Sequence, residues 1–85
     1  LWGARRLQRG SARVWPIPFR QGVWVQLPGL RRLWLYTEAG QLVAHVELPI
    51  PVPLYYWPLE KLPAGLYLLL AEGEETHVQR LLRED

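Results

Sequence analysis

The sequence of 85 residues contains no cysteine, so neither a disulfide framework nor a cysteine-based metal site can form. It also lacks a long apolar run. The longest stretch free of charge and proline is 64–71, whereas a membrane-spanning helix needs about 20 residues. No integral membrane segment is therefore predicted. The chain starts at Leu1 with no methionine and no signal-peptide pattern, which predicts a fragment or the processed tail of a longer precursor.

Residues that carry catalytic chemistry are scarce. Ser11 is the sole serine and has no nearby histidine or aspartate to activate it. The two histidines, His45 and His77, alternate with apolar residues and lack further ligands at metal-site spacing, so each is predicted to face solvent. The glutamates of the 72–75 turn are predicted to be solubilising charges rather than a pair in a cleft. The sequence thus predicts no enzyme, no cofactor and no metal site.

Charge is distributed unevenly along the chain. Residues 1–43 contain seven arginines and one glutamate, whereas residues 44–85 contain three basic and seven acidic residues. A basic half is compatible with nucleic-acid binding, but no nucleic-acid motif accompanies it. Solvated arginines, some of them in a flexible leader, are the favoured interpretation, and no nucleic-acid partner is predicted.

Short segments rich in valine, leucine and aromatic residues alternate with glycine or proline at the spacing of a β-sandwich or barrel. Seven strands are predicted, at residues 14–15, 22–27, 32–37, 41–48, 54–59, 65–72 and 75–83. Two antiparallel sheets packed face to face follow, so the expected fold is all-β, a seven-stranded antiparallel Ig-like β-sandwich over residues 13–85. Residues 1–12 are predicted to form a flexible leader.

The alternation within the strands predicts which side chains are buried. The expected core residues are Val23, Val25, Leu33, Leu35, Val46, Leu66 and Leu68. Pro28-Gly29 is predicted to be a turn, because glycine accepts the positive φ of a type II turn. Prolines at every second position of 49–53 predict an extended edge segment, because proline cannot donate to a β-ladder.

Trp24 and Trp34 alternate with inward-facing aliphatic residues, so both rings are predicted to point outward on neighbouring strands. Three interpretations remain open. The rings could pair across the strands, cover the docking surface of a neighbouring domain, or form a stacking platform for a polysaccharide.

Four motifs occur in order between Val14 and Arg83. They are Pro16, Pro18 and Phe19; then Tyr36 and Gly40; then Leu62, Pro63, Ala64, Gly65 and Tyr67; and finally a glycine hairpin at 72–74 with a last strand that contains Arg80, Leu81, Leu82 and Arg83. In this order the chain resembles the type A C-terminal sorting domain of proteins exported by the type IX (Por) secretion system. It departs from the family pattern at Ile17, where asparagine is usual, and at Thr37, where aspartate is frequent.

The resemblance implies a folded export signal that is itself the substrate of other proteins. A translocon recognises the domain after an N-terminal cargo of the same precursor has entered the periplasm, and the cargo then reaches the cell surface or is secreted. A sortase-like protease usually cuts before the first strand. Here the small and polar residues of the leader, Arg9, Gly10, Ser11 and Ala12, fit such a cut.

The last strand is the predicted recognition element, because an open strand edge can accept a partner strand. Arg80, Leu81, Leu82 and Arg83 would contact the translocon if they face outward; alternatively, Leu81 and Leu82 complete the core. Two rival functions are an accessory sandwich that binds polysaccharide through Trp24 and Trp34, and a structural Ig-like spacer without a ligand.

Overall fold

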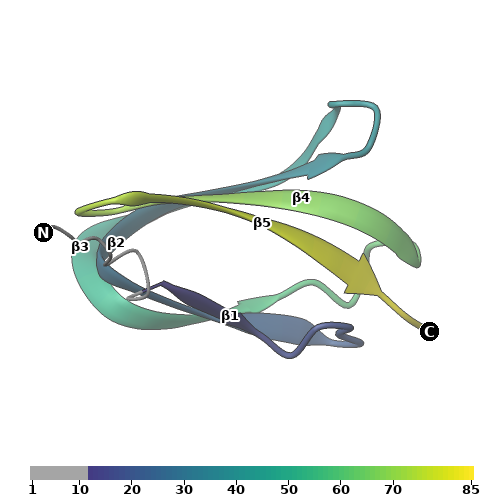
Figure 1. Ribbon diagram of the computed structural model, residues 1–85, viewed down its shortest axis with the longest axis horizontal. Helices are drawn as coiled ribbons and strands as arrows, with labels where there is room; N and C mark the ends of the chain where they lie inside the picture. The colour runs from purple at the N-terminus through teal and green to yellow at the C-terminus, as the bar shows by residue number, and fades with distance from the viewer. Residues whose placement is uncertain (1–11) are drawn as a thin grey trace, which may run out of the picture.

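The computed structural model describes residues 12–85, which form five β-strands and no helix (Figure 1). The strands are β1 (Arg13–Trp15), β2 (Gly22–Thr37), β3 (Leu42–Pro58), β4 (Gly65–Glu72) and β5 (Thr76–Arg83). Each strand pairs antiparallel with its neighbour. The prediction of an all-β, antiparallel fold is confirmed for this part of the chain.

Five strands form instead of the predicted seven because two pairs of predicted strands are continuous. β2 covers the segments 22–27 and 32–37, and β3 covers nearly all of 41–48 and 54–59. Pro28-Gly29 is therefore not a turn between strands but a bend within β2. Pairing with β3 skips there from Gln26 to Leu30, which marks a bulge. Gly29 adopts a φ of 67°, so the strand changes direction without ending.

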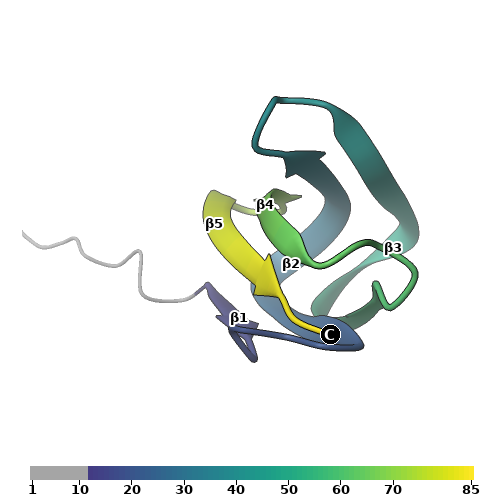
Figure 2. The same cartoon turned by 90° about the vertical axis from the view of Figure 1, so that its right-hand side faces the viewer.

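Because both long strands bend, one sheet curls into a half-barrel in place of the two separate sheets that were predicted (Figure 2). β3 pairs with both halves of β2. On the other edge of β2, β1 pairs with its first half and β4 with its second half, and β5 continues from β4. We call β1 with the first half of β2 and the end of β3 the first layer. The second layer consists of the start of β3, the second half of β2, β4 and β5.

The hydrophobic core fills the space between the two layers. Its buried side chains are Phe19, Val23, Val25, Leu27, Leu30, Leu33, Leu35, Trp57, Leu59, Tyr67, Leu69, Ala71 and Leu81. Leu27, Leu30 and Leu33 lie three residues apart, although a regular strand turns every second residue to the same face. Register shifts at these steps supply the extra residue, so β2 keeps its leucines inward while it bends.

The predicted core is correct on β2 and wrong on β4. Val23, Val25, Leu33 and Leu35 are buried, and Val46 packs against the core while remaining half-buried. Leu66 and Leu68 are instead 43% and 39% exposed, and their neighbours Tyr67, Leu69 and Ala71 are buried. Almost every position of β4 is apolar, so alternation could not decide which set faces inward. Pairing decides it, because Leu69 lies opposite the buried Leu35.

Pro49, Pro51 and Pro53 lie in the middle of β3, and all three are exposed. Among the strands of residues 12–85, β3 pairs only with β2, so the prolines occupy an edge where no ladder donor is required. The prediction of an extended edge segment is confirmed.

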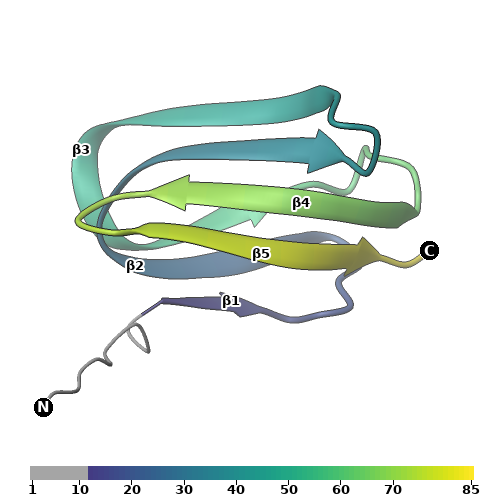
Figure 3. The ribbon, with the colours of Figure 1, turned by 45° about the horizontal axis from the view of Figure 1, so that its top comes forward.

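The half-barrel is closed at one end by Phe19, which follows β1 and is buried. Its backbone N–H donates to the carbonyl of Leu82 at 2.9 Å, and its carbonyl accepts from the N–H of Glu84 at 2.8 Å. Figure 3 shows this end of β5 above the segment that follows β1. Apart from this bridge, the same edge of β5 pairs with no other strand in the described part of the chain.

Gly65 begins β4 with a φ of 152°, in a region that side chains disfavour. No atom lies within 4 Å of the position that a Cβ would occupy. Gly65→Ala should therefore lower the free energy of unfolding by about 1–3 kcal/mol through backbone strain alone. Urea unfolding followed by tryptophan fluorescence measures this cost, and an unchanged midpoint would show that the glycine has no conformational role.

Candidate functional site

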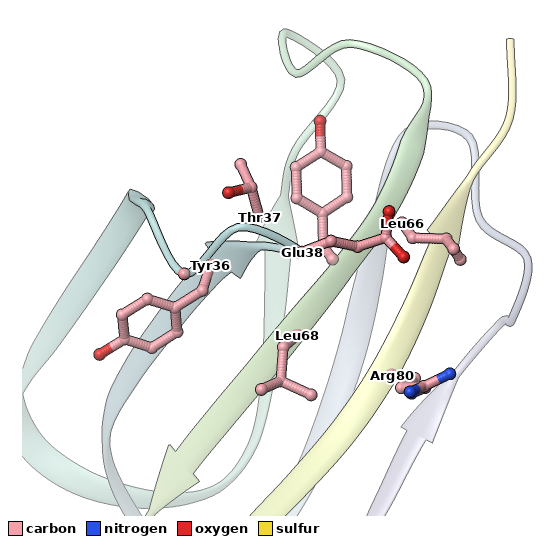
Figure 4. A pocket seen from close by; sticks show the side chains of 8 residues that line it. Tyr36, Thr37, Glu38, Leu66, Leu68 and Arg80 are labelled. Atoms are coloured by element: carbon pink, nitrogen blue, oxygen red, sulfur yellow. The ribbon is translucent and has the colours of Figure 1, made fainter.

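A pocket of about 270 Å³ opens at one end of the second layer (Figure 4). Three segments that are distant in the sequence line it: the end of β2 with the turn that follows it, the start of β4 and the middle of β5. The lining residues are Tyr36, Thr37, Glu38, Gly40, Leu66, Tyr67, Leu68 and Arg80. Tyr36, Gly40 and Tyr67 are positions of the family motifs, and Arg80 is a predicted recognition residue. The fold therefore brings together residues that the sequence analysis took from three separate motifs.

The turn that forms one wall of the pocket is fixed by Thr37 and Gly40. The N–H of Gly40 donates to the Thr37 carbonyl at 2.9 Å, and Gly40 adopts a φ of 88°. The Thr37 hydroxyl accepts from the N–H of Gln41 at 3.2 Å. An aspartate carboxylate accepts the same kind of local backbone hydrogen bond in a turn, with its oxygens one bond further from the backbone. Threonine thus makes the local hydrogen bond at the position where the family often has aspartate.

The opposite wall begins at the 62–67 motif. The Tyr67 ring is buried, and its hydroxyl donates to the Pro63 carbonyl at 2.5 Å, which ties the loop before β4 to the core. Leu62 also packs against the core, whereas Pro63 and Ala64 are exposed. Because Tyr67 points inward, alternation turns Leu66 and Leu68 outward. Figure 4 shows Glu38 extending from the turn toward Leu66.

Arg80 supplies a positive charge beside these leucines. It lies opposite Leu68 in the β4–β5 pairing and is exposed. Its guanidinium forms no hydrogen bond or ion pair with another residue of 12–85. A partner could therefore pair with Arg80 without breaking an interaction within this part of the domain.

An apolar surface continues from the pocket across the second layer, and we call it the outer apolar face. Its members are the exposed Leu42, Leu66, Leu68 and Val78 and the half-buried Tyr36, Leu70 and Leu82. Large apolar side chains side by side on a small domain are typical of an interaction surface. Sequence analysis missed this face because it placed Leu66 and Leu68 in the core. The orientation follows only from the long-range pairing, in which Leu69 lies opposite the buried Leu35.

An ion-pair network crosses the far end of the outer apolar face. Arg32 contacts Glu72 at 2.9 Å and Glu47 at 3.2 Å, which connects β4, β2 and β3. Hydrogen bonds to Glu72 and then to Glu47 raise the pKa of Arg32 above its ordinary value. All three side chains are exposed to solvent, so the network contributes little to stability and mainly marks the polar border of the face.

Of the four predicted recognition residues, only Arg80 is exposed. Leu81 is buried in the core, so for Leu81 the alternative interpretation holds. Leu82 is half-buried on the outer side, opposite Leu66. Arg83 is also half-buried, and its guanidinium donates to the Glu60 carbonyl at 2.8 Å, which fastens β5 to the loop before β4.

The predicted pair of outward tryptophans is not a single platform. Trp24 and Trp34 lie on the same strand, in the two halves of β2 that belong to different layers. Trp24 contacts Trp15 and Tyr56, whereas Trp34 stacks on His45 with ring centroids 5.6 Å apart. The prediction of neighbouring strands is wrong because β2 continues through the bend at Pro28-Gly29.

The remaining predicted sites are placed as follows. Pro16 and Pro18 are exposed on the first layer, next to the buried Phe19. Arg9, Gly10 and Ser11 of the expected cleavage region lie outside the described residues. Ala12 is half-buried and packs against the core, so it belongs to the folded domain.

Within residues 12–85, no three histidines or carboxylates come together in a way that could hold a metal ion. Nor does this part of the chain contain a helix that could cross a membrane. When the chain is compared with protein-family models, with curated proteins and with solved structures, nothing matches it.

Proposed function

We propose that this chain is the C-terminal sorting domain of an exported bacterial protein, recognised by a type IX secretion translocon. The observation that carries the proposal is the pocket at the end of the second layer. It joins Tyr36, Gly40 and Tyr67, three positions of the family motifs, to Arg80 and to the outer apolar face. A translocon must distinguish its substrates by an accessible surface of defined sequence, and this surface has both properties.

On this proposal the domain is a ligand for other proteins and performs no chemistry itself. The core and the 62–67 loop hold the surface in shape, and the translocon contacts the exposed leucines and Arg80. A sortase-like protease then cuts the precursor on the N-terminal side of Ala12, because Ala12 packs against the core. The cargo passes through the periplasm and ends at the cell surface or outside the cell.

Leu68→Glu tests the proposal with little disturbance of the fold. Leu68 is 39% exposed, and a glutamate there would lie opposite Arg80, so the domain can accept it. The substitution both removes apolar surface and places a carboxylate where it can pair with the Arg80 guanidinium. In a bacterium carrying the type IX system, a periplasmic reporter fused to the intact chain should reach the surface, and the Leu68→Glu fusion should do so about tenfold less efficiently.

Leu54→Glu is the matched control, because Leu54 is a comparably exposed strand leucine on the other side of the domain. That fusion should be exported like the unmodified one, and thermal unfolding of both variants checks that they remain folded. If a folded Leu68→Glu variant is exported as efficiently as the control, the outer apolar face is not the signal. If the intact fusion is never exported, the sorting function itself is wrong.

A further inference from the structure

The outer surface of the first layer carries a row of three aromatic rings. Trp15, Trp24 and Tyr56 lie opposite one another on β1, β2 and β3. The centroids of the two indoles are 6.5 Å apart with an interplanar angle of 20°, and Tyr56 follows at 5.1 Å from Trp24. Trp24 is 39% exposed and Tyr56 37% exposed, so solvent reaches both rings. The row is separate from the pocket of the second layer and shares no residue with it.

A shallow groove of about 480 Å³ runs beside this row. It is lined by Pro16, Pro18, Arg20, Gln21, Gly22, Trp24, Tyr56 and Glu84. Gly22 leaves room for one of the rings, because a Cβ at that position would lie 2.6 Å from the Tyr56 hydroxyl oxygen. The Tyr56 hydroxyl therefore lies against Gly22, and both residues line the groove.

Polar groups without partners surround the exposed rings. The side chains of Arg20, Gln21 and Glu84 form no hydrogen bond or ion pair with any residue of the described part of the chain. Arg20 offers donors, Glu84 offers acceptors and Gln21 offers both. Their two charges are of opposite sign, so the groove has no net preference for an ionic ligand.

We propose that this groove binds a neutral polysaccharide built of pyranose units. A pyranose ring has an apolar face of C–H groups and a rim of hydroxyls. The apolar face packs against Trp24 and Tyr56, while the hydroxyls donate to Glu84 and accept from Arg20 and Gln21. Because Arg20 and Glu84 carry opposite charges, a charged sugar gains no advantage over a neutral one. The inference does not depend on the sorting function, because the two surfaces belong to different layers.

Isothermal titration calorimetry of the full chain with soluble oligosaccharides of glucose, mannose or galactose tests the proposal. At least one of them should bind, and Trp24→Ala should weaken that binding about tenfold or more. Trp24→Phe keeps an apolar ring and should retain most of the affinity. Arg20→Ala should weaken binding less than Trp24→Ala, because it removes one set of donors and leaves the rings in place.

Trp34→Ala is the control, since it removes a tryptophan of the same strand from the other layer. Its affinity for the saccharide should equal that of the unmodified chain. Equal losses for Trp24→Ala and Trp34→Ala would overturn the proposal, and so would the absence of binding to every oligosaccharide tested. Binding of a proline-rich peptide at Trp24 without any saccharide binding would assign the groove to a different ligand.

Discussion

Replacing Leu81 with alanine is expected to remove most of the free energy that stabilises the folded protein. The side chain is 1% exposed and lies in the core of a small domain. Truncation of a fully buried leucine costs about 2–5 kcal/mol, because contacts are lost and a cavity remains. A domain of this size has a total stability near the lower end of about 5–15 kcal/mol. Urea unfolding, followed by circular dichroism in the β-sheet region, measures the loss.

Val78→Ala is the control for that experiment. Val78 lies on the same strand but is 55% exposed on the outer side, so its truncation should change stability by no more than about 0.5 kcal/mol. Comparable losses for the two variants would contradict the inward orientation of Leu81.

A C-terminal deletion is a poor test of the proposed sorting function. Deleting residues 81–85 would remove a core leucine together with the carbonyl of Leu82 and the N–H of Glu84 that hold Phe19. The deletion would therefore unfold the domain, and loss of export could not be assigned to recognition. Substitutions on the outer apolar face separate the two effects.

Gly73→Ala is expected to destabilise the domain by about 3 kcal/mol, the upper part of the range for overpacked positions. Gly73 lies in the hairpin between β4 and β5, at the point where this hairpin contacts the bend of β2. A Cβ there would lie 2.6 Å from the Pro28 carbonyl oxygen and 2.8 Å from that of Gly29. Both obstacles are backbone atoms, so no side chain can rotate away. The shift would also disturb the hydrogen bond from the Glu74 N–H to the Pro28 carbonyl.

Gly40→Ala separates crowding from backbone strain. Gly40 has a φ of 88° but no atom within 4 Å of its hypothetical Cβ, so the variant should lose only about 1–2 kcal/mol. The comparison is made by thermal or urea unfolding of both proteins. A Gly73→Ala variant that loses no more stability than Gly40→Ala would show that the hairpin and the bend are not in close contact.

Local patterns predicted the strands well where alternation was unambiguous. The 22–27 and 32–37 segments place their aliphatic residues at every second position, and Val23, Val25, Leu33 and Leu35 are all buried. The segment at 65–72 is apolar on both faces, so only the long-range pairing with β2 could determine its orientation. No local pattern contains that information, and the outer apolar face was missed for this reason.

The continuity of β2 through its bend could not be predicted from the local sequence either. Proline followed by glycine is a standard turn signal, and here the same dipeptide makes a bulge within a strand. Whether such a dipeptide ends a strand depends on what the flanking segments can pair with. In this chain β3 is long enough to follow β2 on both sides of the bend. The missed continuity of β2 also made the tryptophan prediction wrong. Trp24 and Trp34 were predicted to lie on neighbouring strands, but they lie in different layers and contact different residues.

β2 has a further consequence, which concerns how the domain unfolds. This strand belongs to both layers, and its inward leucines are packed on both sides of the bend. Separating β2 from β3 in one layer is expected to weaken their pairing in the other layer, because both strands continue through the bend. The backbone amides of β2 on the two sides of the bend are therefore expected to exchange with solvent through the same opening.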